Sequence, residues 1–586
     1  MDLQKKQIIR RNIATEHKLP DDLHPTLQRI YAARDLLRPE EMDYSIGKML
    51  PPDLLAGMDQ AVSLLVTALE EKQHIVIVAD YDADGATSCA LAVRGLQKLG
   101  AHQVSYLVPN RFDYGYGLTP EIVQLALPLS PDLLVTVDNG ISSIEGVKAA
   151  HQCGISVLVT DHHLSGPQLP EADAIVNPNQ SGDSFPSKAL AGVGVIFYVL
   201  LALRSQLRKN NWFALQKINE PNLAQLLDLV ALGTVADLVP LDHNNRILVA
   251  RGLERINRKQ CCPGITALAE VAGKTSASLS ATDLGFFLAP RINAAGRLQD
   301  MSLGIACLLT DDATEAMAMA RRLDQINIER RAIQDDMQNQ ANLIIDQLVI
   351  EDKELPPALC LYDKNWHQGV IGLVASRVKE KLHRPVIAFA PGGGNTIKGS
   401  ARSIPGLHIR DLLDNVAARH PDILRKFGGH AMAAGLTLQH EHLQRFESLF
   451  REEVEKVATK EILQHNLVSD GELALSDFHL DFAESLQKAG PWGQGFPEPV
   501  FDGQFDVIEQ RIVGENHLKM VLRPCSENPT ETRHIDAIAF NYANKLSAAE
   551  LASVRAAFRL DVNEFKGRRS LQAIINYMEP ADKTPA

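Results

Sequence analysis

Short apolar, β-branched runs alternate with helical stretches in the chain after residue 70. Three of them are HIVIVAD (74–80), DLLVTVDNG (132–140) and SVLVTDHH (156–163), and each ends in acidic or polar residues. Continuous apolar strands separated by helices predict a parallel α/β sheet that is covered on both faces. Ligands of such sheets bind beyond the carboxyl ends of the strands. The pattern therefore predicts an α/β domain with a site at its acidic strand ends.

The remaining pattern predicts several further parts. The first residues are polar and helical in tendency, and a stretch from Asp311 to about Leu348 lacks Gly and Pro, so it reads as one long connecting helix. Strand-like runs at 358–363 and 385–391 indicate a second α/β unit, and closely spaced short strands beyond Pro491 indicate a small β-barrel. We predict an N-terminal helical segment (1–70), the first α/β domain (71–310), the helix (311–350), the second α/β domain (351–458), the barrel domain (459–577) and a disordered tail (578–586).

Charge and composition narrow the class of protein. The 59 Lys+Arg and 72 Asp+Glu give a net charge of -13, which argues against a polycation that binds nucleic acid through bulk charge. A locally basic region remains, because residues 371–435 hold ten Lys/Arg against four Asp/Glu. The longest nearly apolar run, 189–203, is shorter than the roughly 20 residues of a membrane span, so no membrane association is expected. None of the seven cysteines forms a C-x-x-C pair, which favours a reducing cytoplasm.

The sharpest local motif is ADYDADGATS (79–88), in which Asp80, Asp82 and Asp84 alternate before Gly85. A calcium EF-hand loop begins in the same way, but its twelfth position requires Glu and here is Leu91. A helix N-cap explains one aspartate. Three crowded carboxylates repel one another unless a cation lies among them, so the motif predicts a metal site.

Other strand ends add ligands to this site. Asp138 follows the second strand, His162 and His163 follow the third, and Asp237 lies in the apolar segment LGTVADLVPL (232–241). Carboxylate and imidazole together suit Mn²⁺ or Zn²⁺, whereas a carboxylate-dominated site suits Mg²⁺ or Mn²⁺. The set exceeds the needs of one ion and suits two bridged ions, which activate water and stabilise both oxygens of a phosphoryl ester. Phosphoester hydrolysis is the predicted reaction class.

The motifs DYDADG, VDNG, DHH and GTVAD resemble those of the DHH phosphoesterase superfamily. The resemblance continues through RINAAGRL (291–298), NWHQGVIGLVASR (365–377), GSARS (399–403) and FGGHAMAAGL (427–436), and this series is similar to the RecJ family of exonucleases. It implies a DHH catalytic domain, a DHH-associated domain and a C-terminal OB-fold barrel. It also implies two Mn²⁺ or Mg²⁺ ions and 5′→3′ hydrolysis of single-stranded DNA to mononucleotides in DNA recombination and repair.

The resemblance assigns roles residue by residue. Its metal positions match Asp82, Asp84, Asp138, His162 and Asp237, with Asp138 as the bridge, and His163 matches a residue that faces the phosphate. Smaller members carry a His where this chain has Val78, so we expect Asp80 to compensate as an additional acid near the first ion.

Residues that bind the DNA strand are expected in four segments. Gly428 and Gly429 let backbone N–H groups approach a phosphate beside His430, unless they only form a turn. Arg402 with Ser400 can grip a phosphate, although a solvated surface is the alternative. The other expected contacts are Arg291, Asn293 and Arg297, and Arg111 with Tyr114, which either stack bases or pack in a loop.

Two other functions compete with this interpretation. A DHH phosphodiesterase for short oligoribonucleotides or cyclic dinucleotides would not need the long chain and its β-domain. A non-catalytic DNA-binding scaffold would be expected to lack metal ligands, and here the acids are present. The resemblance further implies single-strand-binding protein and a RecQ-type helicase as partners, and a monomer is expected.

Overall fold

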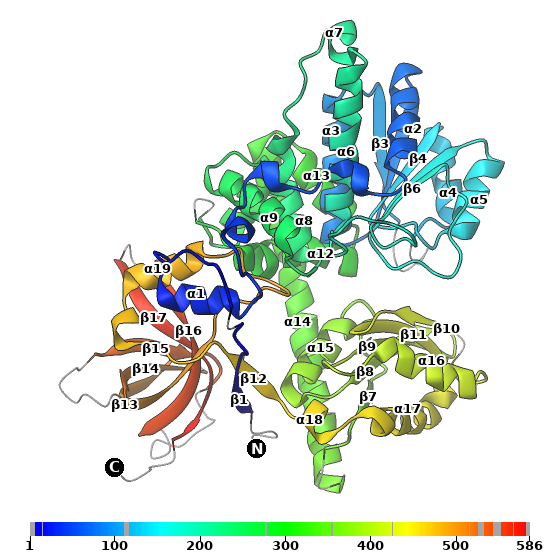
Figure 1. Ribbon diagram of the computed structural model, residues 1–586. Helices are drawn as coiled ribbons and strands as arrows, with labels where there is room; N and C mark the ends of the chain where they lie inside the picture. Colours follow the sequence, from blue (N-terminus) through cyan, green and yellow to red (C-terminus); the bar gives the residue numbers. More distant parts are fainter. Residues whose placement is uncertain are drawn as a thin grey trace. The chain divides into compact units, whose positions relative to one another are not determined.

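The computed structural model describes residues 6–14, 16–109, 117–275, 278–352, 355–424, 426–514, 516–525, 533–542, 552–565 and 568–581 (Figure 1). The backbone divides into two compact units, each built from separate stretches of chain. Unit 1 comprises Met1–Asn12, Ile328–Leu480 and Val500–Ala586, and unit 2 comprises Ile13–Asn327 and Asp481–Pro499. Among the described residues, no helix has both the length and the apolar character of a membrane span.

Unit 2 contains the predicted parallel sheet. Its strands run in the order β3-β2-β4-β5-β6, and every neighbouring pair is parallel. The strands are β2 (His74–Ala79), β3 (Gln103–Leu107), β4 (Leu133–Val137), β5 (Ser156–Thr160) and β6 (Ala174–Val176). All residues of β2 and β4 are buried, as continuous apolar runs require when helices cover both faces.

Helices cover this sheet on two sides. Val76 and Val78 of β2 pack in one apolar cluster with Ile122 and Val147, which come from α4 (Pro120–Ala126) and α5 (Ile144–Gln152). The helices α3 (Ala83–Lys98) and α6 (Gly192–Lys209) contact the sheet as well, and α3 packs against α8 (Leu227–Ala236). The carboxyl ends of β2, β4 and β5 therefore open toward the beginnings of α3 and α6 and the end of α8.

The rest of unit 2 is helical and supports this arrangement. The described elements are α1 (Pro25–Ala32), α2 (Met58–Glu70), α7 (Trp212–Gln216), α9 (His243–Asn257), α10 (Pro263–Val271), α11 (Ala281–Asp283), α12 (Ala289–Leu298), α13 (Ser302–Leu309) and most of α19 (Leu480–Lys488), with the short helices η1 (Pro39–Met42), η2 (Ile46–Lys48), η3 (Pro52–Leu54), η4 (Leu127–Leu129), η5 (Leu223–Leu226) and η6 (Leu284–Leu288). The long helix α14 (Ala313–Asp352) contributes residues to both units and lies close to the range predicted from the sequence.

Unit 1 contains a mixed five-stranded sheet in the order β10-β11-β9-β8-β7. Its strands are β7 (Leu359–Tyr362), β8 (Val386–Gly393), β9 (Thr396–Arg402), β10 (Lys426–Gly429) and β11 (Ala433–Gln439). Along β9, Ile397 and Ala401 enter a core with α16 (Ile409–Arg419) and α17 (Leu443–Val457). Alternation places Ser400 and Arg402 on the opposite face, where α15 (Ile371–Leu382) lies.

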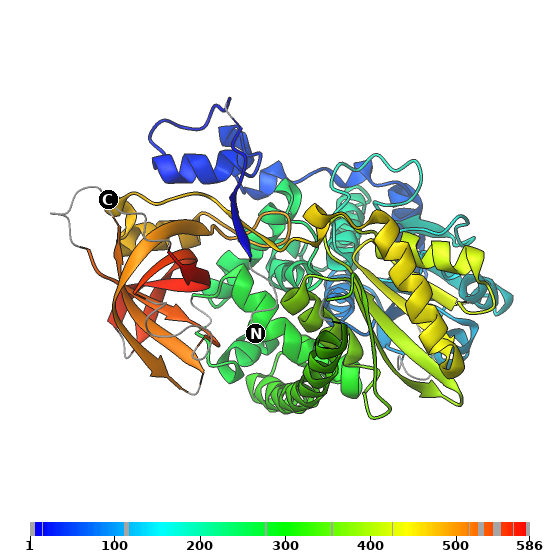
Figure 2. The ribbon, with the colours of Figure 1, turned by 90° about the horizontal axis from the view of Figure 1, so that it is seen from below.

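Unit 1 also contains a closed five-stranded barrel in the order β13-β14-β15-β17-β16. Its strands are β13 (Phe501–Val513), β14 (His517–Pro524), β15 (Ile535–Ala539), β16 (Ser553–Phe565) and β17 (Arg568–Pro580), and Figure 2 shows them curling around one another. Phe505 packs edge-on against Phe558 in its interior. The barrel predicted from the short strands is confirmed.

The beginning of the chain differs from its prediction. Instead of helix, Gln7–Arg10 forms β1, which pairs in parallel with β12 (Asn466–Ser469) (Figure 1). Ile8 is buried against Ala557 and Tyr577 of the barrel. The two adjacent isoleucines of QIIR suit a strand, and the pairing partner lies too far along the chain to be read from local sequence. The short helix α18 (Lys460–Leu463) and η7 (His440–His442) precede β12, and η8 (Leu475–Asp477) follows it.

Candidate metal centre and strand-binding residues

The sheet of unit 2 brings three acidic strand ends together. Asp80 follows β2, Asp138 follows β4 and Asp161 follows β5, and these strands are neighbours in the sheet. Because parallel strands end at the same edge, residues that are distant in sequence become adjacent. Asp237 reaches the same place from the end of α8.

Seven side chains of unit 2 form three overlapping groups. Within each group the candidate ligand atoms lie within 4.8 Å of one another. The groups are Asp80 with Asp82 and Asp138, Asp84 with His162 and Asp237, and Asp138 with His162 and His163. Asp138 and His162 each belong to two groups. His162 Nε2 lies 3.1 Å from Asp138 Oδ1 and 3.4 Å from Asp237 Oδ2.

Asp138 occupies a left-handed backbone conformation, with φ +62°. Its N–H donates to Thr160 O at 3.1 Å, which ties the end of β4 to β5. Its side chain faces the beginning of α6 so closely that a Cβ placed on Gly192 would lie 2.7 Å from Asp138 Cβ. Strained residues of this kind persist where the surrounding structure holds them, and they concentrate at functional sites.

Backbone N–H groups orient the carboxylates of the DYDADG segment. Asp82 is the N-cap of α3, and its Oδ1 accepts from Gly85 N at 3.0 Å. Both oxygens of Asp84 accept from the N-terminus of α6, from Gly192 N at 2.7 Å and from Val193 N at 2.9 Å. The cap interpretation thus accounts for Asp82, while Asp84 is fixed by a helix that begins more than a hundred residues later.

Asp161 organises the turn that carries the two histidines. Its Oδ1 accepts from the N–H groups of His162 at 2.7 Å and His163 at 3.1 Å, and it contacts His163 Nδ1 at 2.8 Å. Its Oδ2 accepts from Ile141 N at 2.9 Å. The first residue of the DHH triplet is therefore a positioning residue, and its contacts direct His163 Nε2 away from Asp161.

The electrostatics of the cluster follow from burial and crowding. Burial and the neighbouring charge of Asp82 raise the pKa of Asp84 to about 7. Burial and the surrounding aspartates likewise raise the pKa values of Asp138 and Asp237. Burial alone would lower the pKa of His163, but the hydrogen bond and charge of Asp161 outweigh it and raise this pKa to about 9. Divalent cations fit such a donor set, because their charge offsets the repulsion among buried carboxylates.

The segment RINAAGRL forms α12 and packs beside this cluster. Asn293 Oδ1 accepts from Ala83 N at 2.8 Å, which supports the first turn of α3. Arg291 is buried, and its Nη2 lies 2.9 Å from Asp324 Oδ1. Arg297 is half-buried in the last turn of α12. Arg291 and Asn293 thus have structural partners, and their contact with a DNA strand stays a prediction. Arg111 and Tyr114 lie outside the described residues.

The remaining predicted contacts gather on one sheet in unit 1. Arg402 Nη1 donates to Ser400 Oγ at 3.0 Å, and burial lowers the pKa of Arg402. Gly428 of β10 pairs with Gly435 of β11, which in turn pairs with Ser400. A Cβ on Gly428 or Gly435 would meet nothing within 4 Å, so this strip of backbone is open. His430 follows β10, where its N–H donates to Ala433 O at 2.8 Å.

The sequence analysis missed several residues that position the side chains of the candidate metal centre. Gly192 and Val193 bind Asp84, and Asn139 Nδ2 donates to Val78 O at 3.0 Å and Val137 O at 2.9 Å, which joins the ends of β2 and β4. Asn139 lies in the VDNG motif and was within reach of motif reasoning. No local signal indicates Gly192, because its partner Asp84 lies in a distant segment.

Comparisons with known proteins agree with this architecture. The sequence matches the DHH family, N-terminal domain over residues 74–234, the DHHA1 domain over 355–456 and the RecJ OB domain over 469–577. It is 50% identical over 578 residues to the single-stranded-DNA-specific exonuclease RecJ of Salmonella typhimurium, covering 98% of this chain and 100% of that protein. The Escherichia coli protein of the same name gives the same identity and coverage.

Solved structures show the same likeness. The crystal structure of RecJ in complex with Mn²⁺ from Thermus thermophilus matches with a TM-score of 0.77 and 30% identity, covering 95% of this chain and 76% of that one. The corresponding complex with Mg²⁺ matches with a TM-score of 0.71 and 28% identity, covering 95% of this chain and 75% of that one.

Proposed function

We propose that this chain, which belongs to the RecJ family of single-stranded-DNA-specific exonucleases, hydrolyses the phosphodiester bonds of single-stranded DNA. The finer parts of the proposal are digestion in the 5′→3′ direction, release of mononucleotides and a role in DNA recombination and repair. The observation that carries the proposal is the set of three overlapping ligand groups at the strand ends of unit 2.

Two Mn²⁺ or Mg²⁺ ions would be held by Asp82, Asp84, Asp138, His162 and Asp237, with Asp80 as an additional acid. Asp138 is the proposed bridge, since it belongs to two of the groups and lies 3.1 Å from His162. When bound, such ions activate water and stabilise the charge that develops on the oxygens around phosphorus.

Other side chains and backbone groups of the protein would then orient the DNA strand. Asp161 holds His163 Nδ1 at 2.8 Å, and in this proposal His163 Nε2 donates to a phosphate oxygen. In unit 1, the open strip of Gly428 and Gly435 permits close approach of a sugar-phosphate backbone, beside the guanidinium of Arg402. Gly429 and His430 at the end of β10 complete this proposed phosphate-binding set.

The test compares wild-type protein with Asp138→Asn, which keeps the side-chain shape and removes the charge. The substrates are a long 5′-phosphorylated single strand, the same strand as a duplex, and a dinucleotide, each with Mn²⁺ and with a chelator. We expect the wild type to degrade the long single strand only with Mn²⁺, and the variant to lose at least about 10³-fold in kcat/KM, or ~4 kcal/mol.

Asp228→Asn is the matched control, because Asp228 is a buried aspartate of unit 2 whose Oδ2 accepts from Cys262 N at 2.8 Å, away from the three ligand groups. Labels at the 5′ or the 3′ end report the direction of digestion. Wild-type activity in Asp138→Asn would contradict the proposed centre. Faster cleavage of the dinucleotide than of the long strand would favour the phosphodiesterase instead.

Other parts of the proposal rest on family membership and on the sequence. We propose the cytoplasm as the location, a monomeric state, and single-strand-binding protein and a RecQ-type helicase as partners. We propose the domain boundaries given from the sequence with two changes: Gln7–Arg10 forms β1 and not helix, and residues 578–580 end β17 and do not belong to the tail. The matched ranges 74–234, 355–456 and 469–577 fall inside the corresponding domains.

A further inference from the structure

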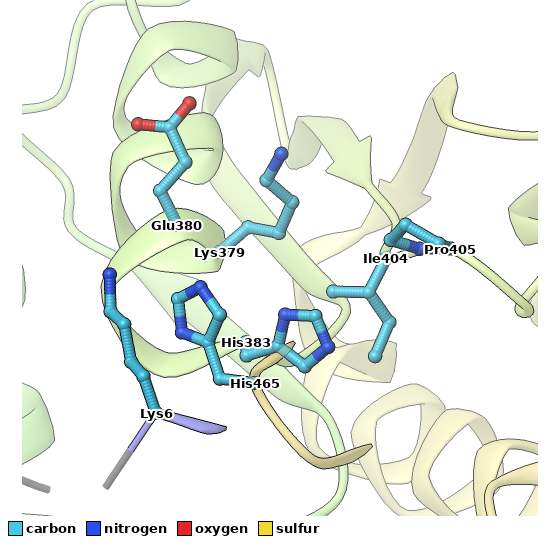
Figure 3. Close-up of a pocket in the computed structure, with 7 residues that line it drawn as sticks. All are labelled: Lys6, Lys379, Glu380, His383, Ile404, Pro405 and His465. Carbon is cyan, nitrogen blue, oxygen red and sulfur yellow. The ribbon is translucent and has the colours of Figure 1, made fainter. Parts of the chain in front are cut away.

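A small pocket in unit 1 lies away from the residues discussed so far. Figure 3 shows that its charged and imidazole side chains come from three segments: Lys6 before β1, the end of α15, and His465 before β12. Ile404 and Pro405 form an apolar side. Its volume is about 280 Å³, which suits a small ligand group. The pocket thus joins the start of the chain, the mixed sheet and the segment that leads to the barrel.

The polar side chains that line this pocket are mainly those of lysine and histidine. Lys379 and His383 come from the end of α15, and they join Lys6 and His465. Glu380 is the acid of the lining, and its Oε2 lies 3.5 Å from Arg377 Nη1, so its charge is partly engaged. Within the described ranges, no acid forms an ion pair with Lys379.

The two imidazoles are stacked and oriented. The rings of His383 and His465 have centroids 4.7 Å apart and planes inclined by 15°. His383 Nε2 lies 3.2 Å from Ile462 O. A carbonyl oxygen only accepts, so the proton is on Nε2 and neutral His383 keeps a lone pair on Nδ1.

The surrounding charge acts on these rings. Burial, together with the positive charges of Lys6 and Lys379 and with His383, lowers the pKa of His465 to about 4. Burial and neighbouring cations also lower the pKa of His383. A positive potential that disfavours a further proton is a potential that favours a bound anion.

We propose that this pocket binds a phosphate group, with Lys6 and Lys379 as its charged contacts and the stacked His383 and His465 as its wall. The group is supplied either by a free nucleotide or by the backbone of a DNA strand. The inference goes beyond the proposed hydrolysis, because the pocket contains none of the candidate metal ligands of unit 2. A bound phosphate would connect Lys6, the end of α15 and His465.

The test measures binding to the full-length protein in a chelator, so that hydrolysis plays no part. The variants are Lys379→Gln and Lys6→Gln, which keep much of the side-chain length. Lys488→Gln is the control, since it removes the same charge from unit 2 at a side chain that is 80% exposed. Thermal unfolding of each variant without phosphate checks that the fold is retained.

The two sources give different results. For a free phosphate source, we expect inorganic phosphate and thymidine 5′-monophosphate to bind at least about tenfold more weakly to both pocket variants than to the control. If the DNA backbone supplies the phosphate, the affinity of the pocket variants for inorganic phosphate and thymidine 5′-monophosphate stays unchanged. The slope of log K against log salt for an oligothymidylate then becomes less steep by about 0.7 for each lysine removed. Pocket variants that equal Lys488→Gln in both measurements would overturn the proposal, whatever the outcome for hydrolysis.

Discussion

Gly192→Ala tests whether the first residue of α6 sets the position of Asp138. The added Cβ would lie 2.7 Å from both Cβ and Oδ1 of Asp138, whereas ordinary contacts begin near 3.4 Å. The difference, 3.4 − 2.7 = 0.7 Å, must be absorbed by movement of Asp138 or of the helix. Gly192 N also donates to Asp84 Oδ2 at 2.7 Å, so displacing the helix disturbs a second acid of the cluster.

The magnitude follows from this displacement. A misplacement of about 1 Å in a catalytic group costs about 10²-fold in rate, so we expect kcat/KM to fall by about 30-fold, or ~2 kcal/mol. Overpacking costs about 1–3 kcal/mol of folding free energy. Replacing a helical glycine by alanine returns up to ~1 kcal/mol, so the fold should survive with a modest loss of stability.

The assay is steady-state degradation of a long single strand with Mn²⁺, alongside thermal unfolding of the same preparations. Gly194→Ala is the matched control on the same helix, because its new Cβ would meet Leu190 Cδ1 at 2.5 Å, which is the end of a flexible side chain. We expect this control to stay close to wild type in activity. If Gly192→Ala remained within about twofold of Gly194→Ala, the reasoning that couples α6 to Asp138 would be refuted.

Three further outcomes are expected. Mn²⁺ at 100 times its dissociation constant should stabilise the wild type against unfolding by about 2.7 kcal/mol for each bound ion, measured by calorimetry, and should stabilise Asp138→Asn less. Equal shifts would contradict the ligand assignment. Burial, the cations Lys6 and Lys379, and His383 lower the pKa of His465 to about 4 in the folded protein, whereas the pKa of His465 in the unfolded chain is about 6.5. The folded protein therefore binds a proton at His465 less readily than the unfolded chain does. Stability should therefore fall as the pH drops from about 6.5 to about 4, and denaturant titrations should show a smaller fall for His465→Gln; an identical fall would contradict the assignment. Phe540, 51% exposed and edge-on to His517 at 5.2 Å, is expected to stack a base, so Phe540→Ala should weaken oligothymidylate binding by about 1–3 kcal/mol, and unchanged binding would exclude this platform.

The candidate metal centre was largely predictable because its residues follow a simple rule. Asp80, Asp138 and the DHH turn each end an apolar run, and parallel strands bring their carboxyl ends to one edge. Continuous apolar runs placed the strands, the apolar segment around Asp237 indicated that acid, and family resemblance supplied the roles. Nothing local indicates that α6 holds Asp84, since Gly192 reaches it only through the tertiary fold.

Other parts depended equally on long-range packing. The strand β1 exists because Asn466 and its neighbours pair with Gln7–Arg10, and the sequence between them offers no sign of this pairing. Arg291 looked like a phosphate contact in the sequence, and the fold gives it an acid partner in Asp324. Charged residues near a motif can serve either structure or substrate, and only their neighbours distinguish the two.

The pairing of β1 with β12 has a consequence for the order in which the protein is made. A ribosome synthesises β1 first and then all of Ile13–Asn327, which belongs to unit 2, before Asn466 of the partner strand exists. Domains generally fold as units during synthesis, so most of unit 2 can form before β1 can pair with β12. Unit 1 can be completed only when the last third of the chain has emerged. Residues 7–10 are therefore made long before they can reach their final places.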